Sequence, residues 1–174
     1  TELNEHTRDS ELQDLLAPLL AGHDVGLLSE AGCPAVADPG ANLVRLAHRQ
    51  GIRVKPLVGP SSILLALMAS GLVGQRFTFH GYLPTKPEER TRALKELEQR
   101  AGRDNAAQAF IETPYRNNAM LEGILAACRD DTLVSVACDL TLASEFIATK
   151  PVTEWRLTLP DLHKRPSVFL IWRQ

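Results

Sequence analysis

Three segments of the sequence place acidic, hydroxyl or glycine residues where a predicted strand ends and a helix begins. The first runs from Ser29 to Gly40 and holds Glu30 beside Gly32, the second is Gly59-Pro60-Ser61-Ser62, and the third is Ile111-Glu112-Thr113-Pro114-Tyr115-Arg116. Open α/β sheets bind their ligands at the carboxyl ends of strands. These segments are therefore the candidate positions for ligand chemistry.

Each segment has a ligand-binding interpretation and a plainer one. Glu30 can accept hydrogen bonds from ligand hydroxyl or amine groups, and Gly32 allows close backbone approach, but the same loop can be a turn that needs Gly and Pro for geometry alone. Ser61 or Ser62 at a helix N-terminus can hold a carboxylate or a phosphate, or can simply cap the helix. A hydrolase nucleophile elbow needs a second glycine, and Ile63 stands near its place.

Other chemical patterns are weak or absent in the sequence. Glu112 at a strand end is usually a surface residue or a helix-dipole partner. The cluster His163-Lys164-Arg165 is typical of solvated charge, with a phosphate contact as the alternative. The histidines show no metal-ligand spacing, and neither GxGxxG nor GxxxxGKS occurs, so we expect no metal site and no Rossmann or P-loop nucleotide site.

The composition is that of a soluble globular protein. Of 174 residues, 44% are hydrophobic, and the formal net charge is −2. The apolar run Ile63 to Ala69 is far shorter than the roughly 20 residues of a membrane span, so we expect no membrane association. The three cysteines are odd in number and lack a CxxC pair, which favours a reducing, cytoplasmic compartment.

The elements that must position these segments follow from periodicity and turn residues. In the first half we expect a helix ending near Gly22 with a Ser10/Gln13 capping box, a strand at 25–29, a helix opened by Asp38 and Pro39, a strand at 52–57 and a helix stopped by Gly71. Helix and strand alternating in this order indicate half of a parallel α/β sheet.

The second half is expected to form its own α/β lobe. Strands are predicted at 77–83, 106–111, 132–137, 145–149 and 167–172. Helices are predicted at 87–100, with a Thr85/Glu88 capping box, and after Thr113-Pro114, with Met120, Leu121, Ile124 and Leu125 on one face. We place the boundary near residue 75, giving a partial lobe over 1–75 and a complete lobe over 76–174.

Taken in order, the motifs resemble a known family. They are Leu27-Leu28-Ser29-Glu30-Ala31-Gly32-Cys33-Pro34 with Asp38-Pro39-Gly40, Val58-Gly59-Pro60-Ser61-Ser62, Ala69-Ser70-Gly71-Leu72, Gly81-Tyr82-Leu83-Pro84 and Glu112-Thr113-Pro114-Tyr115-Arg116. Their order over about residues 3–173 resembles the tetrapyrrole methylase family of class III, S-adenosylmethionine-dependent methyltransferases. Within it, the sequence is most similar to the branch that methylates a ribose 2'-hydroxyl of small-subunit ribosomal RNA.

The resemblance implies a two-lobed α/β protein that binds S-adenosylmethionine between its lobes and forms homodimers, with ribosomal RNA as a partner. It places Ser29, Glu30 and Ala31, followed by Pro34, at the loop along the methionine and ribose of the cofactor. It places Ser61 and Ser62 after the family's Pro-Gly turn. It also puts the residues that enclose the adenosine in the second lobe, at Glu112, Asp139 or Leu140, and Ser167. The sulfonium is already an activated methyl donor, and no catalytic base is assigned.

The sequence departs from the family pattern at three places. The branch typically has Arg-Glu-Leu-Thr-Lys where this chain has Cys138-Asp139-Leu140-Thr141-Leu142, and Lys-Gly-Glu where it has Lys164-Arg165-Pro166-Ser167. Two cations are lost, which weakens a phosphate-contact argument. The family's first strand and Gly/Pro-rich loop have no counterpart, so we expect the sheet of the first lobe to be truncated.

Three functions therefore remain open at this point. The first is methyl transfer to an RNA ribose, or else to a tetrapyrrole or another small molecule. The second is a non-catalytic module with a partial cofactor cleft and a dimer interface. The third is a binding protein for another nucleotide, which would use the helix end at Pro60-Ser61-Ser62.

Overall fold

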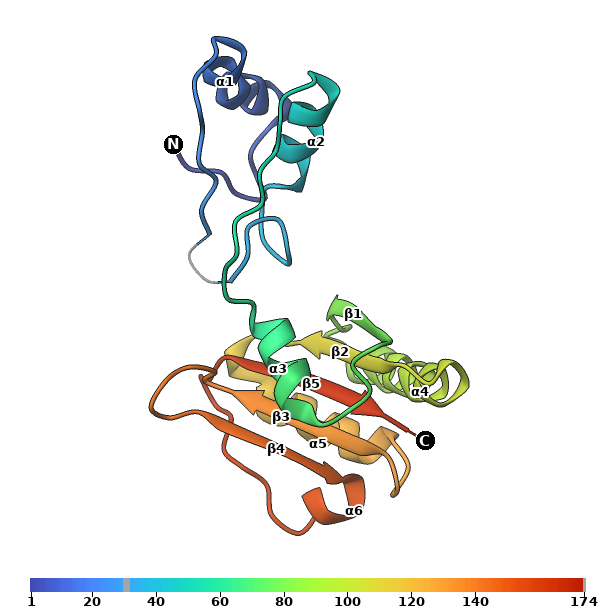
Figure 1. Cartoon of the computed structure of the whole chain (residues 1–174). Coiled ribbons are helices and arrows are strands. Elements are labelled where there is room, and N and C mark those ends of the chain that lie inside the picture. The colour runs from blue at the N-terminus through green and yellow to red at the C-terminus, as the bar shows by residue number, and fades with distance from the viewer. Residues whose placement is uncertain (30–31, 174) are drawn as a thin grey trace. The chain divides into compact units, whose positions relative to one another are not determined.

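The computed structural model describes residues 1–29 and 32–173 and divides into two compact units, Thr1–Ser61 and Ser62–Gln174. Figure 1 gives the order of elements along the chain. The two units are described separately below. The predicted lobe boundary near residue 75 differs from this division, because helix α3 (Ser62–Ser70) packs on the sheet of the second unit. The extent of the family's two lobes stays a prediction.

The first unit is built from two helices, α1 (Asp9–Leu20) and α2 (Ala41–Arg49). Their apolar faces bury Leu12, Leu16, Leu43 and Ala47 in a small core. The helices lie where periodicity predicts them, but their starts differ. Gly40, with a φ of 134°, precedes α2 in place of Asp38. The Ser10/Gln13 capping box is also wrong, since Glu11 accepts the Arg8 amide at 2.7 Å.

The two strands predicted in this unit, at 25–29 and 52–57, are not present among its described residues. A strand needs a neighbour that pairs with its backbone N–H and C=O groups. Neither segment finds one in the described part of the unit. Val25 is 45% and Leu57 81% exposed, while Ile52 and Val54 are only partly buried against the helix core. Apolar composition therefore predicted strands that lack a pairing partner.

The second unit contains a five-stranded mixed sheet in the order β1-β2-β5-β3-β4. Its strands are β1 (Phe77–Tyr82), β2 (Ala107–Ile111), β3 (Leu133–Cys138), β4 (Phe146–Pro151) and β5 (Ser167–Trp172). Among the pairs of neighbouring strands, only β1 and β2 are parallel to each other, and they are joined through α4 (Pro87–Asp104). A short 3-10 helix η1 (Pro114–Arg116) leads into α5 (Asn117–Ala127), and α6 (Val152–Trp155) follows β4.

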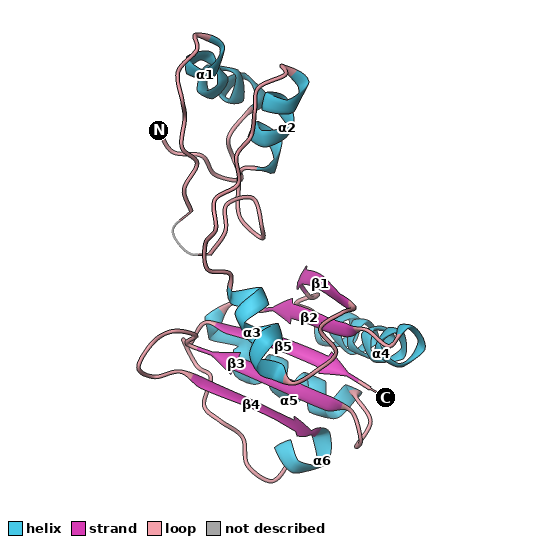
Figure 2. Cartoon of the chain, viewed as in Figure 1, coloured by secondary structure: helices cyan, strands magenta, loops and turns pink. Residues whose placement is uncertain are grey.

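Helices cover both faces of this sheet (Figure 2), with α3 on one face and α4 and α5 on the other. Strand alternation explains the two layers. Phe110 and Phe169, paired across β2 and β5, stack at 5.9 Å in the core under α4 and α5. Small side chains such as Ala107, Ala109 and Ala137 line the face under α3. The mixed α/β fold class and the five strands of the second half are confirmed.

One detail of the second unit differs from expectation. The Thr85/Glu88 capping box is wrong, because α4 begins after Lys86, which makes no side-chain cap bond. Gly81 has a φ of 64° and lies where the β1–β2 register shifts, a backbone region that favours glycine. The following residue, Tyr82, is 60% exposed.

Candidate functional site

One edge of the five-stranded sheet gathers the predicted residues of the second half. The strands β1, β2 and β3 end at this edge, and β5, which is antiparallel to β2 and β3, begins there. Glu112 therefore follows β2, Asp139 follows β3, and Ser167 opens β5, all at the same edge. Connections at strand ends are where α/β proteins position ligand-binding groups.

Glu112 is held at this edge by its own loop. Its side chain is fully buried, and Oε1 accepts the Thr113 amide at 2.6 Å and the Arg116 Nη2 at 2.6 Å. This hydrogen bond to Glu112 raises the pKa of the Arg116 guanidinium above its usual value. Glu112 Oε2 is buried without a hydrogen-bond partner among the described residues. The carboxylate thus keeps one acceptor oxygen uncommitted, which is uncommon for a buried acid.

Asp139 is fixed by a second ion pair on the neighbouring strand end. Arg165 Nε donates to Asp139 Oδ2 at 2.8 Å, and Ser144 Oγ donates to the same oxygen at 2.9 Å. The hydrogen bond from Arg165 is the main cause that lowers the pKa of Asp139 below its usual value. Asp139 has a φ of 50°, a backbone conformation that non-glycine residues rarely adopt. Its backbone amide donates to the Pro166 carbonyl at 2.9 Å.

Asn117, which the sequence did not single out, completes the edge together with Ser167 and Leu140. Asn117 is completely buried, and its Nδ2 donates to the Arg165 carbonyl at 2.6 Å, while its Oδ1 has no partner among the described residues. Ser167 Oγ donates to the same carbonyl at 3.0 Å. Leu140 is half-buried and packs with the core under α3. The loop before β5 is thereby tied both to β3 and to the start of α5.

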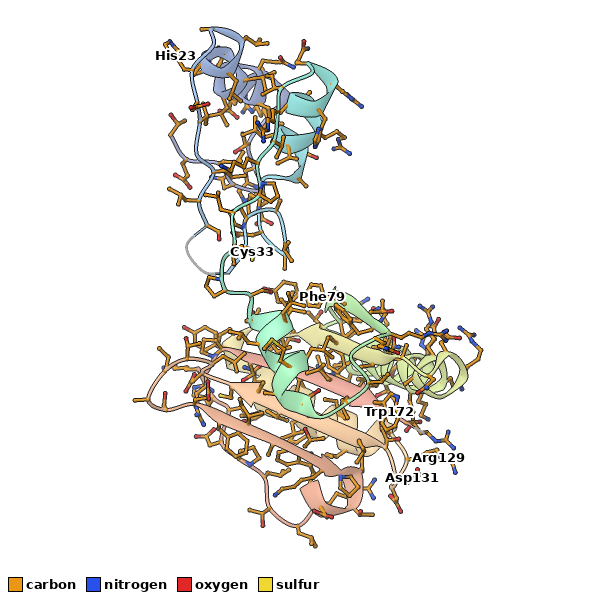
Figure 3. The ribbon with its side chains drawn as sticks, viewed as in Figure 1. His23, Cys33, Phe79, Arg129, Asp131 and Trp172 are labelled. Atoms are coloured by element: carbon orange, nitrogen blue, oxygen red, sulfur yellow. The ribbon has the colours of Figure 1, made fainter. Side chains whose placement is uncertain are left out.

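The remaining predicted residues lie in the first unit, at the start of the second unit, or outside the described residues. In the first unit, Ser29 Oγ donates to the Gly32 carbonyl at 3.0 Å, Pro34 is half-buried, and Cys33 (Figure 3) donates to the Pro60 carbonyl at 3.2 Å. Ser61 is the last residue of the first unit, and Ser62 opens α3 in the second. Glu30 and Ala31 lie outside the described residues.

The edge offers two hydrogen-bond acceptors that have no partner among the described residues, the Oε2 of Glu112 and the Oδ1 of Asn117. A group with amine or hydroxyl donors would satisfy them. An unpaired buried acceptor is costly until a donor reaches it. Within the described chain, no group of three or more His, Cys, Asp or Glu side chains could hold a metal ion. No described helix has the length and apolar character to cross a membrane.

Curated relatives share long stretches of this sequence. The Ribosomal RNA small subunit methyltransferase I of Escherichia coli O157:H7 is 38% identical over 152 residues, which are 87% of this chain and 52% of that protein. The protein of the same name from Haemophilus influenzae is 31% identical over 172 residues, 97% of this chain and 59% of that protein. The chain thus spans between half and three fifths of these relatives.

Solved structures support the fold alone, because their sequence identity is low. The methyltransferase CobJ has a TM-score of 0.62 at 20% identity and is matched over 96% of this chain and 72% of its own. A cobalamin biosynthetic enzyme, cobalt precorrin-4 methyltransferase, has a TM-score of 0.54 at 17% identity, over 97% of this chain and 72% of its own. Both names are those of methyltransferases.

A match of the sequence to a family model shows which family the chain belongs to. The family model described as Tetrapyrrole (Corrin/Porphyrin) Methylases matches residues 1–155, which confirms the resemblance seen in the ordered motifs. That range includes Glu112 and Asp139 at the sheet edge. This chain belongs to the tetrapyrrole methylase family.

Proposed function

We propose that this chain is part of an S-adenosylmethionine-dependent methyltransferase that acts on small-subunit ribosomal RNA. The observation that carries the proposal is the fully buried Glu112, whose Oε2 has no partner among the described residues, at the same sheet edge as Asp139 and Ser167. The named relatives, at 31–38% identity, support ribosomal RNA as the acceptor. Methyl transfer to the ribose 2'-hydroxyl is proposed from the same branch of the family.

In this proposal the residues of the edge bind and orient. Glu112 and Asn117 accept hydrogen bonds from the adenosine part of the cofactor, and the Asp139–Arg165 pair fixes the loops around it. When bound, S-adenosylmethionine supplies a methyl group already activated by its sulfonium. Little acid–base chemistry is then required of side chains, since positioning provides much of the rate. We assign no general base.

Further cofactor-binding residues are proposed from the family resemblance alone. Ser29 and Pro34 would line the methionine and ribose of the cofactor, as would Glu30 and Ala31, which lie outside the described residues. Ser61 and Ser62 would take the positions that follow the family's Pro-Gly turn. Leu140 and Ser167 would close the adenosine pocket beside Asp139. These assignments rest on the family resemblance. They predict that single alanine variants at Ser29 and Ser62 bind the cofactor more weakly than wild type.

The compartment and the assembly are also proposals. All three cysteines are free thiols, which suits the reducing cytoplasm where ribosomes are assembled. A homodimer is proposed from the family, and the outer face of α3 exposes Leu64 by 50% and Met68 by 79%. Sedimentation of the chain over a range of concentrations tests this assembly, and a monomer throughout would contradict it.

The acceptor is tested by incubating the chain with S-adenosylmethionine carrying a radioactive methyl group. Two acceptors are compared, unmodified small-subunit ribosomal RNA and a tetrapyrrole such as uroporphyrinogen. We expect label in the RNA, in a linkage that resists alkaline hydrolysis, as a 2'-O-methyl ribose does. Label in the tetrapyrrole would replace the RNA acceptor. Label in neither, with cofactor still bound, would identify a non-catalytic module, for which the chain's span of about half its relatives is the supporting observation.

A further inference from the structure

Beside the Glu112 edge, an exposed aromatic ring lies between an imidazole and a lysine side chain. Tyr115 in η1 is 70% exposed. The imidazole of His163 meets it edge-on, with ring centroids 6.1 Å apart and an angle of 72° between the planes. Lys164 Nζ lies 5.9 Å from the centroid of the same ring, within the range of a cation–π contact. We call these residues, Tyr115, His163 and Lys164, the Tyr115 surface.

The backbone holds this surface in place. The Lys164 amide donates to the Pro114 carbonyl at 3.0 Å, joining the loop before β5 to η1. Lys164 has a φ of 60°, a strained conformation for a lysine. Such strain persists only where surrounding contacts enforce it, and it often marks functional loops. The neighbouring Arg165 is anchored through Asn117 and Asp139.

The charge that this region presents to solvent is positive. In the Arg116–Glu112 pair, the arginine side chain is 42% exposed while the glutamate is buried, and in the Arg165–Asp139 pair the exposed fractions are 29% and 9%. Lys164 forms no ion pair with any described residue. Asp161 is the exposed acid of this loop, and its Oδ1 already accepts Asn118 Nδ2 and the His163 amide, each at 3.0 Å.

We propose that the Tyr115 surface binds a single-stranded segment of the RNA acceptor, with one base stacked on Tyr115 and the backbone phosphates near Lys164 and His163. This inference rests on the proposed RNA acceptor and names where this chain holds it. An exposed ring beside a lysine cation, in a region of positive charge, is the combination that binds single-stranded nucleic acid with little sequence preference. A duplex hides its base faces in the stack, so paired RNA lacks the face that Tyr115 would bind.

The test measures RNA binding by the full 174-residue chain, with fluorescence anisotropy of a labelled single-stranded 12-nucleotide RNA. Tyr115→Ala should weaken binding about 5- to 150-fold, the fold-change of one stacked base, while Tyr115→Phe keeps the ring and should bind within about twofold of wild type. Lys164→Ala should lower the slope of log affinity against log salt by about 0.7. Lys95→Ala, an exposed lysine on α4, is the matched control and should change neither quantity.

A parallel titration with S-adenosylhomocysteine separates this surface from the cofactor site. Tyr115→Ala should bind it as wild type does, which also shows that the variant is folded. If wild type binds the RNA and Tyr115→Ala binds equally tightly, the Tyr115 surface is overturned while the methyltransferase proposal stands. If wild type binds S-adenosylhomocysteine but not the RNA, both the surface and the RNA acceptor are overturned.

Discussion

Glu112 and Asp139 are both acids at strand ends, yet their surroundings differ. Both carboxylates accept two side-chain or backbone hydrogen bonds on one oxygen, Asp139 on Oδ2 and Glu112 on Oε1. The second oxygen of Glu112, unlike that of Asp139, is buried without a partner among the described residues. A carboxylate oxygen already bonded within the protein holds a loop, and a free one can bind a ligand donor. We therefore propose a positioning role for Asp139 and a ligand-binding role for Glu112.

Asp139 should make stability depend on acid pH. Its folded pKa is lowered below the unfolded value of about 3.9, so its contribution is present above that pH and is lost as the pH falls through the folded pKa. Asp139→Asn should lower the free energy of unfolding by about 1 to 3 kcal/mol at pH 7.

Urea unfolding of wild type and Asp139→Asn at pH 7 and pH 3 checks this. The difference between the two proteins should shrink at pH 3. The exposed Asp131, whose Oδ1 lies 3.6 Å from Arg129 Nε, provides the control (Figure 3). Asp131→Asn should lower the free energy of unfolding by under about 1 kcal/mol. A difference for Asp139→Asn that stays constant between the two pH values would contradict the assignment.

The three cysteines should differ in reactivity. Burial raises the pKa of the Cys128 thiol to about 12 and raises that of Cys138 as well, which keeps both as unreactive thiols at pH 8. Cys33 is half-buried. Titration with an aromatic disulfide reagent should modify Cys33 first in the native protein and all three cysteines in denaturant. Fast native labelling of Cys128, located by peptide mass analysis, would show that the core under α4 and α5 is open.

Residue types alone could predict only part of the site. Glu112 lies in a segment that the strand-end pattern already indicates, whereas Asp139 and Ser167 follow from the family resemblance, since a single acid or serine at a strand end has no specific pattern. Asn117 is not predicted, and Arg165 is predicted only as solvated charge or a phosphate contact. Their partners are distant in sequence: Asn117 bonds the carbonyl of a residue 48 positions away, and Arg165 bonds an aspartate 26 positions away. Only the folded sheet brings such groups together.

At the scale of elements, a buried acid fastens α4 to the loop after α5. Glu98 Oε1 accepts the Arg129 amide at 2.7 Å and the hydroxyl of Thr132, which is itself fully buried. Removing the carboxylate would leave both donors without an acceptor in the protein interior.

Glu98→Ala should therefore lower the free energy of unfolding by about 1 to 3 kcal/mol. Glu98→Gln should lose less, because its amide oxygen still accepts. Glu122→Ala, at an exposed position of α5, should change stability by under about 0.5 kcal/mol. Chemical denaturation measures all three variants. Equal losses for Glu98→Ala and Glu122→Ala would show that the Glu98 contacts add nothing.

The elements differ in how well sequence predicts them, for a physical reason. Helices such as α1 and α5 satisfy their backbone within the segment, so the spacing of apolar residues suffices to locate them. Strands need partners from elsewhere. Those of the second unit pair with one another and were located within a few residues, whereas 25–29 and 52–57 find no partner among the described residues and stay unpaired.

At the scale of the whole molecule, the two units differ in the size of their cores. The first buries Leu12, Leu16, Leu43 and Ala47, while the sheet of the second is buried between two larger apolar clusters. Local stability follows buried apolar contacts. Hydrogen–deuterium exchange should accordingly be faster for the amides of α1 and α2 than for those of β2, β3 and β5. Equal protection in both units would contradict this difference.

We propose that the edge formed by Glu112, Asp139 and Ser167 binds the adenosine part of S-adenosylmethionine. Calorimetric titration of the 174-residue chain with S-adenosylhomocysteine tests it most directly. We predict binding that Glu112→Gln weakens about tenfold or more, the loss of one charged hydrogen bond, and that Glu122→Gln leaves unchanged. Circular dichroism confirms that each variant is folded. No heat of binding at millimolar ligand, or equal affinity for wild type and Glu112→Gln, would contradict the claim.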